Sequence, residues 1–337
     1  MADAAPLPPF LWLTEKDVTS LINLSGVVAA LERALLLEAE GKAKNMYKAQ
    51  TVWDAGSVNV TGAQFVSEGF AGGKMWCNVG GSSEPLTILH DASNGKVKAI
   101  FESIALGQMR TAALASVATK YLAPEGADDL AIVGTGKQSI TQVAAVHVAR
   151  PLKRLRVYSP TPANRASFVD LVKKQFPFEV VNAGSLEDCV KDALMVATFT
   201  RAREPFLHAD MIAKGAHVTA GGAIIPAYAE ISPDVVARAS MIVVDNIEQC
   251  QENARELNDA FAKGIGSGWG AVKQLSEIVK AANGKPARPA GVDLTLYKFM
   301  GLGLGDVAAA IEIYKRAVAK GMGTKREHAV RFLPDLS

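Results

Sequence analysis

The sequence contains few cysteines, no long apolar run and no excess of charge of one sign. Cys77, Cys189 and Cys250 lie far apart, and no Cys-x-x-Cys pair occurs in the 337 residues. This pattern argues against a disulfide framework or a zinc site. The segment from Met1 to Phe10 has three prolines and Asp3 in place of the apolar core of a signal sequence, and no run of 18 apolar residues follows. We therefore expect a cytoplasmic protein without a membrane span.

The overall composition is that of an ordinary folded protein. Hydrophobic residues make up 49% and charged residues 21%, and 36 basic against 34 acidic residues give a formal net charge of +2. No basic cluster with interleaved aromatic residues occurs, so a nucleic-acid partner is not expected. The five histidines show no metal-ligand spacing, so no metal is expected. A chain of this length predicts one large domain or two of medium size.

Two helices are expected near the start of the chain. Thr14, with an acidic residue three positions later, is typical of an N-cap and predicts a short first helix. The apolar spacing after Ser25 predicts a longer helix that stops at Gly41.

A small sheet is expected next. Between residues 48 and 101, short β-rich pieces alternate with glycine and serine, and Asn94-Gly95 predicts a hairpin. We interpret this region as a mostly antiparallel sheet, followed by an Ala- and Leu-rich helix over 103–121.

From residue 130 onward, apolar strands alternate with segments of helical period, such as 163–175 and 209–214. This alternation predicts a parallel, doubly wound sheet, and six strands are the full count of a dinucleotide-binding Rossmann fold. After Asn246 the chain is expected to be helical, and 294–322 is expected to hold a glycine-punctuated segment followed by an amphipathic helix. The six expected strands are 130–133, 155–158, 179–181, 194–198, 217–220 and 241–245.

A glycine-rich turn follows the first of these strands. In Gly134-Thr135-Gly136-Lys137-Gln138-Ser139, the first glycine permits a tight turn and the second lets the backbone approach a pyrophosphate. Ser139 replaces the usual third glycine and is still small. The helix that begins here presents backbone N–H groups to an anion. We predict that Gly134 to Gln138 bind a dinucleotide; the alternative is a loop that only turns the chain.

The end of the second strand bears on the choice of cofactor. An acidic residue there would bind a ribose 2′-hydroxyl and repel a 2′-phosphate. This sequence instead has Ser159, Thr161 and Arg165 in that region, all able to contact a phosphate. We therefore predict NADP (as NADPH) in preference to NAD; the alternative is a polar, solvent-facing loop.

Four segments resemble one known family, the ornithine cyclodeaminase/μ-crystallin family. They are spread over most of the chain, in the family's order. The segments are Gly107-Gln108-Met109-Arg110-Thr111-Ala112-Ala113, Ala131-Ile132-Val133-Gly134-Thr135-Gly136-Lys137-Gln138, His217-Val218-Thr219-Ala220-Gly221-Gly222-Ala223-Ile224-Ile225-Pro226 with Glu230 beyond it, and Thr295-Leu296-Tyr297-Lys298-Phe299-Met300-Gly301.

The resemblance implies an α/β fold in which a Rossmann sheet is inserted into a second α+β domain for substrate binding and dimerisation. The expected boundaries are 118–304 for the Rossmann domain, and 1–117 completed by a C-terminal helix within 305–337 for the other. Members of the family bind a small amino or imino acid and move hydride to or from its α-carbon. A homodimer with a small imino- or amino-acid substrate is therefore expected.

The same resemblance suggests the substrate residues. Arg110 matches the family's arginine, whose planar fork suits a carboxylate, and Lys74 matches a lysine that binds the carboxylate or acts as general acid. Lys48 is the nearest match to a second cationic contact, and Asn78 is expected to line the pocket. The alternatives are a surface arginine on a helix for Arg110 and an ordinary exposed strand lysine for Lys74.

The remaining expected cofactor contacts are Thr198, at the end of the fourth strand, and Lys298 and Gly301 in the last motif. One position departs from the family. In the cyclodeaminases an aspartate lies two residues before the proline of the third motif, and this chain has Ile224 there. Isoleucine exchanges no proton, so Asp-assisted deamination has little support.

We therefore expect an NAD(P)-dependent oxidoreductase that reduces a small imino acid (a ketimine), in reverse an amino-acid dehydrogenase. Two alternatives stay open. One is an ornithine-type cyclodeaminase that releases ammonia, and the other is a non-catalytic cofactor- or ligand-binding protein. The identity of the imino acid is not specified by these residues.

Overall fold

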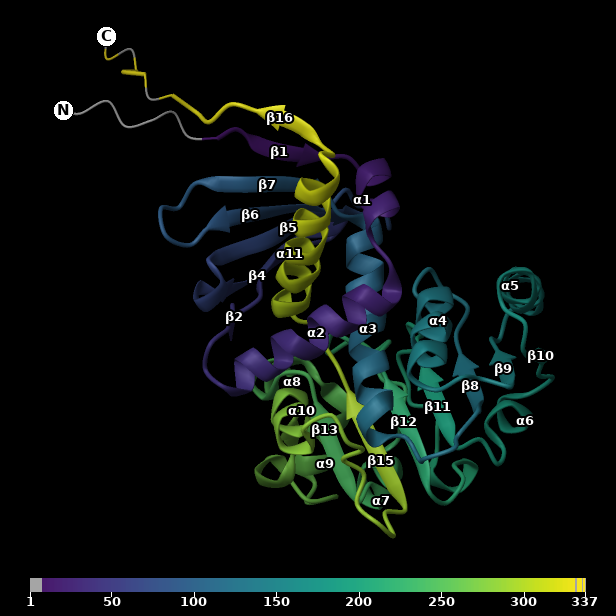
Figure 1. Cartoon of the computed structure of the whole chain (residues 1–337). Helices are drawn as coiled ribbons and strands as arrows, with labels where there is room; N and C mark the ends of the chain where they lie inside the picture. The colour runs from purple at the N-terminus through teal and green to yellow at the C-terminus, as the bar shows by residue number, and fades with distance from the viewer. Residues whose placement is uncertain (1–7, 331, 335, 337) are drawn as a thin grey trace.

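The computed structural model describes residues 8–330, 332–334 and 336, and it contains two sheets connected by long helices (Figure 1). Most of the segment from Met1 to Phe10, for which no signal sequence was expected, lies outside the described residues. One sheet is mixed and mostly antiparallel, and the other is parallel. This arrangement confirms the predicted α/β fold class with a Rossmann sheet and a second α+β part.

The first sheet runs in the order β16-β1-β7-β6-β5-β4-β2, with β3 paired to β4. Only β1 and β7 pair in parallel; the other pairs are antiparallel, as predicted for 48–101. Asn94 and Gly95 lie in the predicted hairpin, within the connection between β6 and β7, and Gly95 has a φ of 73°. The strands are β1 (Phe10–Leu13), β2 (Lys44–Asn45), β3 (Ala49–Trp53), β4 (Gly56–Phe65), β5 (Phe70–Val79), β6 (Leu86–Asp91), β7 (Val97–Glu102) and β16 (Thr324–Arg326), with the 3-10 turn η1 (Val66–Glu68) before β5.

Four helices pack on or beside this sheet. They are α1 (Glu15–Leu21), α2 (Leu24–Ala39), α3 (Ile104–Leu122) and α11 (Gly303–Lys320). At α1, the Thr14 hydroxyl accepts from the N–H of Asp17 and the Asp17 carboxylate accepts from the N–H of Thr14, which confirms the predicted N-cap. The second helix begins one residue before Ser25, because the Asn23 side chain accepts from the N–H of Gly26 and acts as its N-cap.

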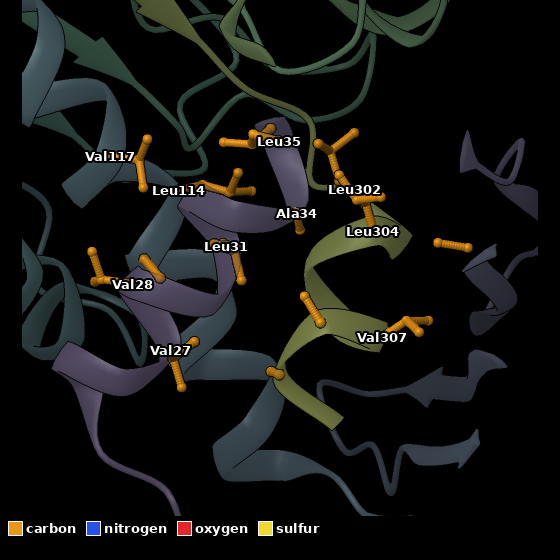
Figure 2. Packing of buried hydrophobic residues seen from close by; sticks show 14 of the residues in the cluster. Val27, Val28, Leu31, Ala34, Leu35, Leu114, Val117, Leu302, Leu304 and Val307 are labelled. Carbon is orange, nitrogen blue, oxygen red and sulfur yellow. The ribbon is translucent and has the colours of Figure 1, made fainter. Parts of the chain in front are cut away.

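The core of this half forms where α2 passes between α3 and α11 (Figure 2). Leu31 of α2, Leu114 of α3 and Val307 of α11 are each at most 1% exposed. Burying an aliphatic side chain of this size contributes about 1.5–3 kcal/mol. Because α11 comes from the end of the chain, this packing holds distant parts of the sequence against β4 and β5.

The second sheet runs in the order β10-β9-β8-β11-β12-β15-β13-β14, and all its pairs are parallel. All six predicted strands are present. The strands are β8 (Asp129–Val133), β9 (Arg154–Tyr158), β10 (Glu179–Asn182), β11 (Met195–Thr198), β12 (Ala216–Ala220), β13 (Met241–Val244), β14 (Lys273–Gln274) and β15 (Leu294–Lys298). The accompanying helices and 3-10 turns are α4 (Ser139–Ala149), α5 (Pro162–Gln175), α6 (Leu186–Val190), α7 (Pro233–Arg238), α8 (Ile247–Asn253), α9 (Arg255–Ala262), α10 (Leu275–Ala282), η2 (Ala209–Met211) and η3 (Trp269–Ala271).

The strand order reverses around β8, from which the chain continues to β9 on one side and later to β11 on the other. In open parallel sheets, ligands bind at the carboxyl ends of the strands at such a reversal. The domain boundaries proposed above at 117/118 and 304/305 stay a prediction.

Two sequence expectations for this half were wrong. The segment 294–298 is a fully buried strand, β15, inserted between β12 and β13; its threonine and lysine had obscured the apolar pattern. The helix expected over 209–214 is only the 3-10 turn η2, because Arg238 binds the carbonyl oxygens of Ala209, Ile212 and Ala213 and holds the segment in an irregular path.

Within the described residues, no single helix is long and apolar enough to cross a membrane; only α1 and α2 taken together, across an 85° bend, pass that test of length and composition.

Candidate functional site

Three charged side chains from distant parts of the chain meet in a buried cluster. Asp306 accepts hydrogen bonds at Oδ1 from Nζ of Lys74 (2.6 Å) and from Nε of Arg110 (2.9 Å). Its Oδ2 accepts from the hydroxyl of Thr61 at 3.1 Å. Lys74 is 5% exposed, Arg110 9% and Asp306 0%, so water screens these charges little. The structure thus brings together the two residues predicted to be catalytic and adds a third.

The local fold explains how these groups meet. Lys74 lies on β5, Arg110 on α3 and Asp306 in the first turn of α11. A Cβ atom at Gly303 would lie 2.3 Å from the backbone nitrogen of Gly62, so only glycine lets α11 begin in direct contact with β4. The carboxylate of Asp306 is also favoured by its place near the helix N-terminus.

The cluster sets the protonation of its members. Burial, and then the nearby cation of Arg110, lowers the pKa of Lys74 to about 8, against the opposing attraction of Asp306. Burial alone would raise the pKa of Asp306, but Arg110 and Lys74 hold it below its usual range. At neutral pH the carboxylate is therefore ionised, and Lys74 is an ammonium that gives up a proton near pH 8. This is the behaviour needed of a proton donor close to physiological pH.

The Arg110 guanidinium is only partly paired within the described part of the chain. Its Nε is bonded to Asp306, whereas its Nη1 is buried and has no hydrogen-bond partner among the described residues. Gly301, with a φ of 92°, lies so close that a Cβ atom there would be 3.0 Å from Nη1. A buried, unpaired guanidinium nitrogen is costly unless an anion satisfies it. The arrangement therefore fits a ligand carboxylate.

Gly301 is held in place by a second buried carboxylate. Asp245 accepts at Oδ2 from the backbone N–H of Gly301 (2.7 Å) and from that of Met300 (2.9 Å). Burial raises the pKa of Asp245 to about 6, while these backbone hydrogen bonds lower it. These hydrogen bonds hold the loop after β15 close to Nη1 of the Arg110 guanidinium.

The other predicted substrate residues lie around the cluster at different distances. Lys48 is half-buried, and burial together with the charge of Arg110 lowers its pKa, so it lies in the field of the cluster. The ring of Trp76 is 4.8 Å from Nζ of Lys74. Asn78 is on the same face of β5 as Lys74 but four residues farther along, about 13 Å at the rise of a β-strand. Its predicted contact with substrate stays a prediction.

The glycine-rich turn has the shape that a dinucleotide requires. Gly134 has a φ of 109°, and a Cβ atom there would lie 2.4 Å from the carbonyl oxygen of Phe199. A Cβ at Gly136 would meet nothing within 4 Å, which leaves open space beside the backbone at the start of α4. No acceptor within the described residues binds the backbone N–H groups of residues 135–138. The turn therefore fits a pyrophosphate; the contacts predicted for Gly134, Thr135, Gly136, Lys137 and Gln138 stay predictions.

The three residues predicted to bind the ribose phosphate lie close together at the end of β9. The Arg165 guanidinium donates to the carbonyl oxygen of Ser159 (2.8 Å) and to the side chain of Asn182 (2.6 Å), and it lies 5.5 Å from the ring of Tyr158. Thr161 is the exposed residue before α5 and makes no side-chain cap. Ser159, Thr161 and Arg165 thus lie together at the end of β9, with no carboxylate among them.

Thr198 and Lys298 are engaged inside the protein. The hydroxyl of Thr198 donates to Glu230 (2.8 Å), which also accepts from the backbone N–H of Gly222 (2.8 Å). Lys298 is fully buried and pairs with Glu256 at 2.6 Å. These contacts shape the loops at the carboxyl edge of the sheet. Whether the two residues also contact a cofactor stays a prediction.

A cavity of about 350 Å³ lies beside the cluster. We call it the side-chain cavity. Its walls include Tyr47, Lys48, Ile224, Gln249, Glu252 and Met300. Ile224 is 39% exposed and presents an aliphatic group to this space.

Sequence reasoning missed Asp306. It was read as part of an amphipathic helix, although an acidic residue surrounded by Leu304, Val307 and Ala308 is a signal in itself. A carboxylate in an apolar helical stretch is rarely fully buried without a cationic partner. That signal indicates a buried ion pair but does not identify its partners.

Known proteins are similar to this chain in sequence and in fold. The ketimine reductase mu-crystallin of Mus musculus is 30% identical over 233 residues, which cover 69% of this chain and 69% of the mouse protein. The structure of the Thermococcus litoralis Delta(1)-pyrroline-2-carboxylate reductase in complex with NADH and L-proline matches this one with a TM-score of 0.87 at 26% identity. The match covers 94% of this chain and 99% of the reductase chain. An archaeal alanine dehydrogenase dimer with bound NAD has a TM-score of 0.86 at 26% identity, with the same coverage.

The family model for the ornithine cyclodeaminase/mu-crystallin family matches residues 11–321, nearly the whole chain. The resemblance predicted from four short segments is therefore confirmed, and this chain belongs to the ornithine cyclodeaminase/mu-crystallin family.

Proposed function

We propose that this protein is an NAD(P)-dependent oxidoreductase that reduces the C=N bond of a small imino acid, with the reverse reaction of an amino-acid dehydrogenase. The observation that carries the proposal is the buried cluster of Lys74, Arg110 and Asp306, in which Nη1 of Arg110 is unpaired. The similar proteins named above as ketimine and pyrroline-2-carboxylate reductases support the same reaction type.

Each residue of the cluster has a distinct part in this reaction. The free edge of Arg110 binds the substrate carboxylate and fixes the imine carbon at the carboxyl edge of the Rossmann sheet. Lys74 donates a proton to the imine nitrogen as that carbon accepts hydride, and it regains the proton from solvent. Asp306 acts through the other two, by keeping their charged groups in position. A reduced nicotinamide bound at the sheet edge would supply the hydride.

Ile224 favours reduction over deamination. A cyclodeaminase needs a group that manages protons beside the substrate nitrogen, and the aliphatic side chain of Ile224 cannot do so. Reduction needs only one proton per turnover, which Lys74 can provide.

We also propose NADPH as the preferred cofactor. The cluster of Ser159, Thr161 and Arg165 at the end of β9 supports this choice, because it offers hydroxyls and a guanidinium and no carboxylate that would repel a 2′-phosphate. The similar solved proteins are described with bound NAD or NADH, so the proposal of NADPH is supported by this chain's own residues alone.

We also propose that the protein forms a homodimer. The face of the first sheet opposite α11 exposes apolar side chains on β5 and β6, including Met75 at 57%, Val79 at 46% and Ile88 at 36%. Exposed apolar surface of this kind marks protein interfaces, and the archaeal alanine dehydrogenase is described as a dimer. Light scattering should give twice the mass of 35.6 kDa.

The decisive experiment measures the fate of the reduced cofactor. The enzyme is incubated with pyrroline- and piperideine-2-carboxylate and with 2-oxo acids plus methylamine, with NADPH or NADH, while reduced-cofactor absorbance and ammonia are followed. We expect one reduced cofactor to be consumed per imine. Flat absorbance with release of ammonia from diamino acids would instead identify a cyclodeaminase, and cofactor binding without turnover a ligand-binding protein.

A further inference from the structure

The side-chain cavity has two chemically different ends. One end lies at Lys48 and Met300, next to the cluster, since Met300 precedes the residue that touches Nη1 of Arg110. The other end is formed by α8, which contributes Gln249, Glu252 and Asn253. A substrate whose carboxylate is bound at Arg110 therefore has room to extend its side chain towards α8.

The end formed by α8 carries a carboxylate and a carboxamide. Gln249 is only 5% exposed, and its Oε1 is buried without a hydrogen-bond partner among the described residues. A half-turn about its terminal torsion exchanges the amide oxygen and nitrogen, so either atom can face the cavity. Glu252 accepts a hydrogen bond from the hydroxyl of Tyr47 with one carboxylate oxygen. A buried amide group left unsatisfied costs free energy that a ligand N–H would restore.

The charge at this end has one sign. Glu252 and Glu248 are both on α8, and both raise the pKa of the Tyr47 hydroxyl, after its hydrogen bond to Glu252 and its desolvation. A second carboxylate on the substrate would be repelled here, whereas a cationic or neutral N–H donor would be attracted. Among the described residues that line the cavity, the one cation is Lys48, which lies at the other end, within the field of Arg110.

We propose that the cavity selects imino acids whose side chain ends in nitrogen bearing N–H donors, as in a guanidinium or a carboxamide, and that Gln249 and Glu252 determine this specificity. The inference rests on the proposed function and names its substrate class. Primary amines three or four carbons from the imine are not included, because they would add to the imine carbon and close a ring.

The test compares substrates that differ at the end of the side chain. Methylamine ketimines are formed from 2-oxopentanoate, 2-oxoglutarate, 2-oxosuccinamate and 2-oxo-5-guanidinopentanoate, and kcat/KM is measured for each. We expect the guanidino and carboxamide substrates to exceed the apolar and dicarboxylate ones by at least tenfold. Glu252→Gln should lower the ratio of guanidino to apolar kcat/KM at least tenfold, and Gln249→Leu should lower the ratios for both nitrogen-bearing substrates.

Glu187→Gln is the matched control, since it makes the same change at an exposed position of α6, which does not line the cavity, and should leave both ratios unchanged. A preference for 2-oxoglutarate or 2-oxopentanoate, or equal ratios in Glu252→Gln and the parent protein, would overturn the inference while leaving imine reduction intact. If no imine is turned over, the proposed function fails. Calorimetry with NADP then decides the inference separately, by showing whether L-arginine and L-glutamine bind more tightly than L-norvaline.

Discussion

Replacing Asp306 with asparagine should change the pH dependence of the reaction. The substitution keeps the shape of the side chain but removes the charge that holds Lys74 and Arg110 at 2.6 and 2.9 Å. Burial and Arg110 already lower the pKa of Lys74 to about 8, and Asp306 is the group that opposes them. Without it, Lys74 loses its proton at lower pH.

The size of this change follows from the hydrogen bond that is lost. After exchange with water is taken into account, a hydrogen bond to a charged group contributes about 1.5–3 kcal/mol. A pKa shift of one unit corresponds to about 1.4 kcal/mol. The basic limb of the kcat/KM profile, where reduction fails because Lys74 is neutral, should therefore move from near pH 8 to lower pH by about one to two pH units. Removing one partner of a buried ion pair also destabilises the fold, by about 3–5 kcal/mol.

The assay follows consumption of reduced cofactor across pH for the parent protein, Asp306→Asn and a control, Glu312→Gln. The control makes the same change on the same helix, at a carboxylate that pairs with Arg316 outside the cluster. Titration of the substrate is common to all three proteins, so differences report on the enzyme. A folded Asp306→Asn protein with an unmoved basic limb would refute the role assigned to Lys74 and Asp306.

Four other substitutions test separate parts of the structure. Gly134→Ala should lower the melting temperature of the ligand-free protein, because its Cβ would lie 2.4 Å from the carbonyl oxygen of Phe199. Gly136→Ala should leave that melting temperature unchanged but should lose the stabilisation that NADPH provides. Arg165→Ala should reduce the ratio of kcat/KM for NADPH to that for NADH at least tenfold, and an unchanged ratio would exclude a phosphate contact there. His217 is fully buried, and desolvation followed by the charge of Arg288 lowers its pKa to about 3. Because the unfolded chain binds this proton near pH 6.5, stability present above that pH should fall by about 1.4 kcal/mol per pH unit on acidification, and urea titrations should show a shallower fall in His217→Gln.

The sequence predicted well those features that depend on neighbouring residues. The N-cap at Thr14, the hairpin at Asn94-Gly95 and the glycine turn at Gly134 arise from contacts within a few positions, and each occurs where expected. The six strands of the parallel sheet also appear, because their apolar runs are long enough to read locally.

Prediction failed where distant segments decide the outcome. The residues 294–298 become a central strand because β12 and β13 pair with them on both sides. The buried Lys298 is tolerated there because it pairs with Glu256 at 2.6 Å. The segment 209–214 does not form the expected helix, because the side chain of Arg238 on α7 donates to its carbonyl oxygens.

The same division holds at the candidate site. The sequence by itself determined a glycine-rich turn after the first parallel strand, a match of Arg110 to the family's arginine, and an aliphatic residue, Ile224, in place of an acid. Only the tertiary structure decided that Asp306 lies between Lys74 and Arg110, because α11 meets β4 and β5 across more than 200 residues of chain. Because the cluster is buried away from water, this one carboxylate sets the positions of two cations and the proton affinity of the Lys74 amine.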